Sequence, residues 1–402
     1  MKVLQINAVY GFGSTGVIVK DIEEEIINNG GEAFVAYQYA SGMPTNGYRI
    51  GNAVDWKLHA FLSRFFGKQA YFSKRATKKF LKWIDGVAPD VVHLHNLHAN
   101  YINLPILLNH LAKNNIATVV TLHDCWFFTG KCFHFIESYC DKWQEGCFNC
   151  PRKNADVKSW FLDTSKAVFA DRKKLFAAIN NLTVVGCSEW ISSLAKKSGV
   201  FKDRRVVAIK NGIDLNLFRP TDNKFRVKYN LQDKFIVLGM ANKWLHEDNY
   251  ETVNNLLNTL SDDCAVVLVG VSADRNRTGF NGKVLSIEGV TDKNKLADIY
   301  SSADVFVNLT LADTLPTVNM ESIACGTPVI TYNTGGSVEL VKQGKTGYVV
   351  DKFDYKQILS AIKSVKEDKG FKARCREVAV ENFDKTVKYK EYVNLYNRVL
   401  DK

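Results

Sequence analysis

The sequence predicts an α/β protein made of two Rossmann-like domains. Short runs rich in valine, isoleucine and leucine alternate with longer helical patterns through all 402 residues, which favours parallel sheets covered by helices. The runs are almost continuously apolar, as is typical of parallel strands buried on both faces. About twelve such runs would be more strands than a single sheet usually contains, so we expect two sheets of about six strands each.

The predicted strands form two series along the chain. The first series comprises Val3–Val9, Ala33–Tyr37, Asp90–His95, Ala117–His123, Thr183–Cys187 and Val206–Ile209. The second comprises Phe235–Met240, Ala265–Gly270, Val284–Glu288, Val305–Leu309, Pro328–Tyr332 and Gly347–Val350. Apolar residues at helical spacing predict helices between them, among them Val17–Asn29, Leu104–Lys113, Trp190–Lys197, Leu296–Ser302 and Val387–Leu400.

We place the first domain at residues 1–205 and the second at 206–384, followed by a C-terminal helix at about 385–402. The sequence NGID at Asn211–Asp214 supplies turn-forming residues after the last strand of the first series. It is best interpreted as a structural hinge between the domains.

The bulk composition is that of a globular protein. Hydrophobic residues make up 46% of the chain and charged residues 24%, so disorder is not expected. No apolar run reaches the roughly 18–20 residues that span a bilayer. The beginning, MKVLQINAV, resembles a first strand more than a signal peptide. We therefore expect a cytoplasmic protein with reduced cysteines.

The net charge of +11 indicates anionic partners. Part of it lies in the segment Trp56–Asp85, where eight lysines and arginines are interleaved with aromatic residues. This segment predicts amphipathic helices that cover a sheet and leave a basic face in solvent. The same pattern also suits peripheral contact with an anionic membrane at its inner face. Binding to nucleic acid is not expected, because strand–helix alternation fills the chain.

The most informative stretch runs from Ala303 to Val341. Asp313 and Thr314 are suited to cap a helix, and Pro316 suits its first turn. The free amides of Thr317 and Val318 would then form an anion site for a diphosphate.

Glu321 follows Thr317 by four residues and shares its helix face. Its carboxylate can therefore accept hydrogen bonds from ribose or sugar hydroxyls beside the phosphates. The alternative is that Asp313 only caps the helix and Glu321 is solvated.

A glycine-rich loop follows the first strand. In YGFGSTG, Gly13 and Gly16 open a helix and permit a phosphate or sugar to approach the backbone. A plain tight turn is the alternative. The loop lacks the GxGxxG pattern of dinucleotide-binding folds.

Histidines follow two of the predicted strands. His93, His95 and His98 end one strand, and His123 ends another beside Asp124. Alternating histidines can bind a metal, but the pattern favours polar residues of the core and cleft.

Four cysteines lie close together in the sequence. Cys132, Cys140, Cys147 and Cys150 end in a CxxC pair, which is compatible with a structural zinc ion. Reduced thiols packed among aromatic residues are the alternative.

The stretch from Ala303 to Val341 resembles the acidic signature of retaining family-4 glycosyltransferases with the GT-B fold. Two acidic residues, Asp313 and Glu321, are separated by seven residues, and a CGTPVI-type strand follows. The form DxLPTVxME resembles a bacterial branch that acts in surface-polysaccharide assembly. The resemblance implies two sheets facing across a cleft, with the last helix packing back on the first, acceptor domain.

The resemblance also implies roles for individual residues. Glu321 would bind the donor ribose, Asp313 would contact the transferred sugar, and the amides of Thr317 and Val318 would hold the distal phosphate. His123 would hydrogen-bond the donor sugar, with Gly13 and Gly16 nearby.

The implied reaction is hexose transfer with retention from a nucleoside diphosphate sugar to a saccharide or lipid-linked acceptor. No metal cofactor is required. The alternatives are a nucleotide-sugar epimerase of the same fold and an inactive sugar-nucleotide-binding protein. One departure bears on this choice, since Lys243 takes the first position of the family's basic pair but Asp248 stands where the second cation is usual.

Overall fold

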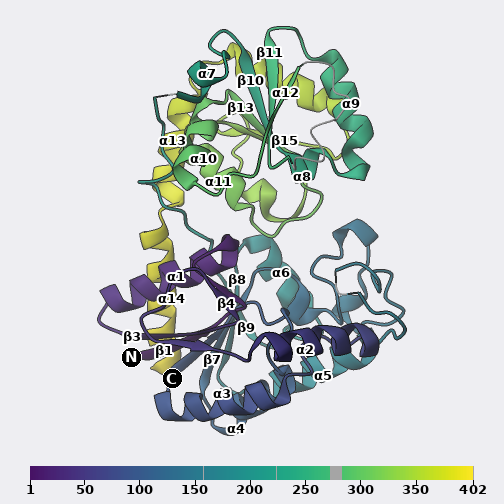
Figure 1. Cartoon of the computed structure of the whole chain (residues 1–402), viewed down its shortest axis with the longest axis vertical. Coiled ribbons are helices and arrows are strands. Elements are labelled where there is room, and N and C mark those ends of the chain that lie inside the picture. The colour runs from purple at the N-terminus through teal and green to yellow at the C-terminus, as the bar shows by residue number, and fades with distance from the viewer. Residues whose placement is uncertain (157, 223, 272–282, 402) are drawn as a thin grey trace. The chain divides into compact units, whose positions relative to one another are not determined.

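The computed structural model describes residues 1–156, 158–222, 224–271 and 283–401. The chain forms two compact units, one made of Met1–Asn211 with Thr386–Lys402 and the other of Gly212–Lys385 (Figure 1). Each unit contains one large sheet, and the described strand pairs are all parallel. The predicted fold class is therefore confirmed.

The first unit contains a seven-stranded sheet in the order β5-β3-β1-β6-β7-β8-β9. Its strands are β1 (Lys2–Ile6), β3 (Glu32–Tyr37), β5 (Gly47–Arg49), β6 (Val91–Leu94), β7 (Ala117–Leu122), β8 (Leu182–Gly186) and β9 (Arg205–Ala208). A separate pair joins β2 (Val9–Tyr10) to β4 (Tyr39–Ala40). The short strands β4 and β5 were not predicted, because two or three residues carry no recognisable pattern.

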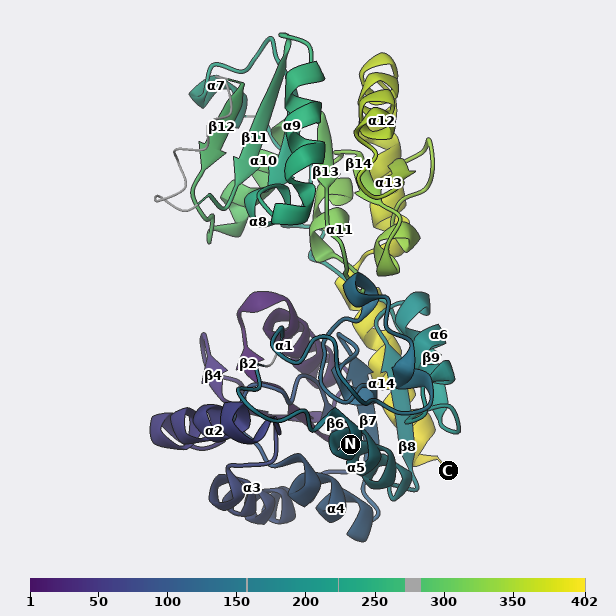
Figure 2. The ribbon, with the colours of Figure 1, turned by 90° about the vertical axis from the view of Figure 1, so that its right-hand side faces the viewer.

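Helices cover both faces of this sheet. They are α1 (Gly13–Asn28), α2 (Ala53–Phe66), α3 (Lys74–Val87), α4 (Leu104–Lys113), α5 (Ser165–Ala177) and α6 (Glu189–Lys197). The last helix, α14 (Lys385–Leu400), lies against the sheet of the same unit in both ribbon views (Figures 1 and 2). Its buried tyrosines pack with residues of the strands. Its Tyr396 hydroxyl lies 2.7 Å from Nδ1 of the buried His93, which fixes the helix to β6.

The second unit contains a six-stranded sheet in the order β12-β11-β10-β13-β14-β15. Its strands are β10 (Phe235–Met240), β11 (Cys264–Val269), β12 (Val284–Ile287), β13 (Val305–Asn308), β14 (Val329–Tyr332) and β15 (Gly347–Val350). Its helices are α7 (Lys224–Lys228), α8 (Ala241–Trp244), α9 (Tyr250–Thr259), α10 (Lys293–Ser302), α11 (Thr317–Ala324), α12 (Tyr355–Glu367) and α13 (Phe371–Asn382). The central strands are almost completely buried, which explains their uninterrupted apolar sequences.

The division of the chain differs slightly from the boundary assigned at residue 205. Residues 206–211 lie in the first unit, because β9 pairs with β8 from Thr183 opposite Arg205 to Gly186 opposite Ala208. The crossover therefore falls within the NGID sequence. No helix of the described residues is both long enough and apolar enough to cross a membrane.

Candidate functional site

The second unit has a topological switch point between β10 and β13. These strands are neighbours, yet the chain proceeds from β10 to β11 and β12 on one side and from β13 to β14 and β15 on the other. In open parallel sheets, ligands bind beyond the carboxyl ends of the strands at such a point. Here those ends lead into α8, which carries Lys243, and through a loop into α11, which carries Thr317, Val318 and Glu321.

The helix α8 is tied to the end of β13, and this fixes the backbone of Lys243. The indole Nε1 of Trp244 donates to the carbonyl of Val307 at 2.8 Å. The amide Nδ2 of the buried Asn249 donates to the carbonyls of Lys243 at 2.9 Å and Leu309 at 2.8 Å. Lys243 itself is partly exposed. The structure therefore places this cation at the switch point.

Asp248, at the position of the family's second cation, lies in a surface turn (Glu247–Asn249). Its side chain is 54% exposed and lies 3.6 Å from Nδ1 of His246. An exposed carboxylate next to an imidazole repels a distant phosphate only weakly, because water screens the charge.

The loop before α11 is held in place by a pair of glycines. The amide of Gly336 donates to the carbonyl of Asp313 at 3.0 Å. Gly335 has φ +53°, and a Cβ there would lie 1.9 Å from the same carbonyl oxygen, so only glycine fits. The Asp313 carboxylate accepts from the amide of Leu315 at 3.1 Å. These contacts fix Asp313 at the mouth of the switch point.

The beginning of α11 differs from the prediction. The helix starts at Thr317, its N-cap residue is Pro316, and no side chain caps it. Asp313 and Thr314 are therefore not the N-cap residues, and Pro316 precedes the first turn, since the Asp313 carboxylate is used in the local turn to Leu315. An uncapped helix start leaves its first amides for another acceptor. Thr317 and Val318 are both partly exposed, so an anion can reach them.

Glu321 lies one turn into α11 and is partly exposed to solvent. The hydroxyl of the buried Tyr300 donates to its Oε2 at 3.2 Å. Burial raises the pKa of Glu321 to about 7 from its usual 4.5, although Tyr300 and the charge of Lys293 oppose the increase. Tyr300, on α10, was missed by sequence reasoning, because nothing in the sequence relates it to Glu321. The carboxyl is thus fixed on one side, with capacity left for further donors.

The raised pKa of Glu321 makes the stability of the folded protein depend on pH. Because the pKa in the folded state exceeds the usual value, the protonated carboxyl favours folding. This contribution to the free energy of unfolding is complete below about pH 4.5 and is lost as the pH rises through 7. The substitution Glu321→Gln removes this loss. Relative to wild type, the ligand-free variant should gain up to about 3 kcal/mol in free energy of unfolding between pH 5 and pH 8, less where water reaches the carboxyl. Urea unfolding at both pH values measures this, and identical pH profiles would contradict it.

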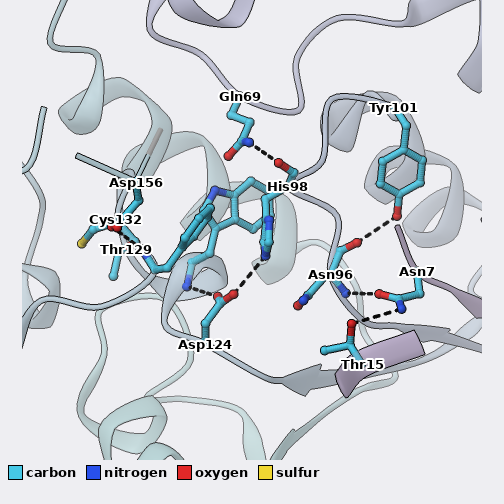
Figure 3. A network of polar contacts seen from close by, with 12 residues as sticks. Asn7, Thr15, Gln69, Asn96, His98, Tyr101, Asp124, Thr129, Cys132 and Asp156 are labelled. Atoms are coloured by element: carbon cyan, nitrogen blue, oxygen red, sulfur yellow. Dashed lines mark hydrogen bonds and ion pairs between the residues drawn. The ribbon is translucent and has the colours of Figure 1, made fainter. Parts of the chain in front are cut away.

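The first unit has its own switch point between β1 and β6. The carboxamide of Asn7, just after β1, accepts from the amide of Asn96 at 3.0 Å (Figure 3). It also donates to the carbonyl of Val9 at 2.7 Å. The glycine loop that follows is held by a hydrogen bond from the amide of Gly11 to the carbonyl of Gly16 at 2.9 Å.

The helix α1 begins in this loop at Gly13, which has φ +63°, and no side chain caps it. A Cβ at Gly16 would lie 3.1 Å from Val9 Cγ2, so the close turn favours glycine there. Both predicted glycines therefore lie at the carboxyl edge of the sheet.

His123 lies at the same edge, directly after β7, and a buried histidine orients it. The Nε2 of His123 lies 3.0 Å from Nδ1 of His95, whose Nε2 lies 3.2 Å from Oε1 of Gln5. Because the Gln5 amide donates to the carbonyl of Val19 at 3.0 Å, its oxygen must accept from His95. His95 therefore accepts at Nδ1, and His123 donates through Nε2.

Burial lowers the pKa of His123 to about 4, against the opposing charge of Asp124. His123 is thus neutral at neutral pH, with its Nδ1 as an acceptor. Such a group can orient a sugar hydroxyl but cannot supply a positive charge.

The predicted histidines His93 and His98 also have polar partners within the first unit. His98 Nε2 lies 2.9 Å from the Asp124 carboxylate, which also accepts from the amide of Trp126 at 2.8 Å (Figure 3). His93 contacts Tyr396 and Thr121, each at 2.7 Å. Within the described ranges, no three or more histidine, cysteine, aspartate or glutamate side chains are grouped so as to hold a metal ion.

The four cysteines border one cavity of about 20 Å³, together with the buried Lys131. The amide of Gly130 donates to Sγ of Cys147 at 3.1 Å. Burial raises the pKa of Cys132 to about 12 and that of Cys147 to about 11, which favours the protonated thiol over the thiolate that zinc binds. Cys140 and Cys150 are partly buried at the same cavity. Structural zinc thus stays a prediction, which metal analysis of the purified protein checks.

Two family models together match nearly the whole chain. Residues 16–217 match Glycosyltransferase Family 4, and residues 221–381 match Glycosyl transferases group 1. With two parallel-sheet units and a switch-point site in each, the fold and these matches define a GT-B glycosyltransferase. The chain belongs to glycosyltransferase family 4.

Individual relatives agree with this family. The chain is 24% identical over 378 residues to the putative colanic acid biosynthesis glycosyl transferase WcaC of Escherichia coli, covering 86% of this chain and 87% of that protein. It is 27% identical over 240 residues to the capsular polysaccharide biosynthesis glycosyltransferase CapM of Staphylococcus aureus, covering 54% of this chain and 62% of that protein.

Solved structures share the fold. The sucrose-phosphate synthase of Thermosynechococcus elongatus aligns with a TM-score of 0.74 at 17% identity, covering 100% of this chain and 99% of that chain. HepE of Anabaena, solved with UDP, aligns with a TM-score of 0.68 at 14% identity, covering 99% and 100%.

Proposed function

We propose that this glycosyltransferase moves a hexose from a nucleoside diphosphate sugar to a saccharide or lipid-linked acceptor in polysaccharide biosynthesis, with retention at the anomeric carbon. The names of WcaC and CapM support the biosynthetic setting. The solved structures of HepE with UDP and with UDP-glucose support the class of donor. A related protein of Escherichia coli, 25% identical over 214 residues, is a galactosyltransferase acting on a diphosphoundecaprenol-linked sugar, which supports a lipid-linked acceptor.

The observation that carries the proposal is the uncapped start of α11 beside the partly buried carboxyl of Glu321. The amides of Thr317 and Val318 suit the distal phosphate, and the carboxylate one turn later suits two adjacent ribose hydroxyls. Asp313, fixed by the glycine pair, suits the transferred sugar. No metal ion is needed in this arrangement, since the helix start and Lys243 supply the positive potential.

The reaction breaks the bond between the anomeric carbon and the leaving phosphate oxygen and forms a bond from that carbon to the acceptor oxygen on the same side of the ring. The acceptor proton passes to the leaving phosphate. The neutral His123 orients the sugar by a hydrogen bond and takes no proton, consistent with its low pKa. The anomeric configuration of the isolated product, read by NMR, tests retention, and an inverted product would overturn it.

The substitution Lys243→Ala should weaken the binding of a nucleoside diphosphate about tenfold or more, because a charged hydrogen bond to phosphate contributes about 1.5–3 kcal/mol. Titration calorimetry with UDP, GDP and ADP measures the dissociation constant. Lys363→Ala is the control, since that lysine is 77% exposed on α12 and pairs with Glu367 of the same helix. An unchanged constant for Lys243→Ala would show that the phosphate is placed wrongly.

The reaction products distinguish the glycosyltransferase from its two alternatives. A nucleotide-sugar epimerase converts the donor without an acceptor, and an inactive binding protein converts nothing. Incubation with each donor sugar, with and without acceptor, distinguishes all three outcomes.

A further inference from the structure

We propose that the outward face of α2 and the adjoining loop at residues 158–162 form a docking surface for an anionic lipid bilayer. The surface comprises Val54, Leu58, Phe61, Phe65, Phe66, Trp160, Phe161 and Leu162. This inference rests on the proposed function, because a lipid-linked acceptor would reach the enzyme at the membrane that this surface binds. Vesicle binding requires no donor, so it is tested independently of that function.

The helix α2 has a buried inner side and, opposite to it, an exposed apolar side. Its inner side buries Trp56, His59 and Ser63, and the indole of Trp56 donates to the carbonyl of Ile50 at 3.0 Å. The outer side carries Val54, Leu58, Phe61 and Phe65 at spacings of three and four residues, which places them in one stripe. Leu58 is 56% exposed and Phe61 50%. A helix needs only one apolar side to pack on its sheet, so the outer stripe is unexplained by folding.

A second segment extends this stripe. The amide of Trp160 donates to the carbonyl of Arg64 at 2.8 Å, which joins the loop to the end of α2. The ring centroids of Phe61 and Trp160 lie 5.7 Å apart, and those of Phe65 and Phe161 lie 5.4 Å apart. Phe161 is nevertheless 63% exposed. Two segments far apart in the sequence thus present their aromatic side chains together, which indicates a built surface.

Basic side chains border the aromatic stripe. Lys57 and Arg64 lie along its edge on α2, and Lys158 precedes the loop aromatics; all three are exposed. Within the part of the chain that the structure describes, none of them forms an ion pair with a carboxylate. The nearby Asp55 and Asp163 are engaged in local hydrogen bonds, the first in the capping box of α2 and the second with the amides of Cys150 and Ser165.

The structure also corrects the sequence-based view of this region. The segment Trp56–Asp85 carries aromatic residues throughout, but those of α3 are used internally, because Phe80 and Trp83 pack with Tyr48 at 5.3 and 4.9 Å between ring centroids. Of the two helices of this segment, α2 carries the exposed apolar face, and it lies at the margin of its unit (Figure 2).

The charge of this surface favours an anionic bilayer over a second copy of the chain as its partner. A second copy of the chain would bring the same cations against each other on a protein whose net charge is +11, and like charges in contact oppose association. An anionic bilayer instead attracts the cations and accepts the aromatic and aliphatic side chains at the level of its headgroups.

Flotation with vesicles of phosphatidylglycerol and phosphatidylcholine tests the proposal on the full chain. Wild type should bind these vesicles and not vesicles of phosphatidylcholine alone. The double variant Phe61→Ser with Phe161→Ser should lower the partition coefficient at least tenfold. Tyr250→Ser with Phe353→Ser is the matched control, because both rings are exposed in the second unit, and it should bind as wild type does.

A second pair separates charge from apolar contact. Lys57→Glu with Arg64→Glu should abolish binding to the anionic vesicles, whereas Lys295→Glu with Lys363→Glu should reduce it only slightly. The unfolding midpoint of each variant confirms that it is folded. Equal vesicle binding by the surface variants and wild type would overturn the proposal. So would a wild-type dimer in analytical sedimentation that the Phe61 and Phe161 substitutions convert to a monomer.

Discussion

Replacing Glu321 with alanine should weaken the binding of a nucleoside diphosphate about 100-fold or more. The carboxylate is expected to accept two ribose hydroxyls, and hydrogen bonds to a charged group contribute about 1.5–3 kcal/mol each. The site is partly closed to water and the Tyr300 hydroxyl already holds one carboxyl oxygen, so the geometry is prepared before the nucleotide arrives. Titration calorimetry at pH 8, above the pKa of about 7, measures the dissociation constant.

Two controls isolate the role of this carboxylate. Glu321→Gln keeps the shape and one acceptor oxygen, and should lose less affinity than Glu321→Ala. Glu377→Ala removes a carboxylate that is 57% exposed and pairs with Lys345, and should bind as wild type does. If Glu321→Ala retained wild-type affinity while folded, the ribose would have to lie elsewhere.

Replacing His123 with alanine should lower the turnover number about 100-fold and leave the affinity for the nucleoside diphosphate unchanged. The neutral imidazole is held by His95 through Nε2, so its orientation is fixed before the donor sugar binds. Loss of one pre-positioned hydrogen-bonding group in a transition state typically lowers the rate 10²- to 10³-fold.

His110→Ala provides the matched control, because that imidazole lies on α4 and pairs with Asp85 at 3.0 Å. Steady-state transfer assays and nucleotide titrations on both variants separate rate from binding. A His123→Ala enzyme with wild-type turnover would remove His123 from the reaction.

The sequence was sufficient to predict the sheets but not their edges. Each long apolar run became a strand, because burial on both faces permits only apolar side chains at those positions. The strand β5 (Gly47–Arg49) was missed, since its three residues form a strand only by pairing with β3. Long-range pairing of this kind leaves no local pattern.

The candidate site residues were proposed from the sequence, but the residues that support them were not. The spacing indicated Asp313, Glu321 and the helix start as candidates, although Pro316 and not Asp313 occupies the N-cap position. Tyr300 and Asn249 contribute by contacts with elements distant in the chain. Sequence spacing within one element cannot indicate such partners.

In the proposed site, the amides at the start of α11 bind a pyrophosphate and the carboxylate of Glu321 accepts hydrogen bonds from the ribose. The most direct measurement is the crystal structure of the protein soaked with a nucleoside diphosphate. We expect the distal phosphate within hydrogen-bonding distance of the amides of Thr317 and Val318, and both ribose hydroxyls on the Glu321 carboxylate. A nucleotide bound anywhere else, with Glu321 still paired only to Tyr300, would contradict it.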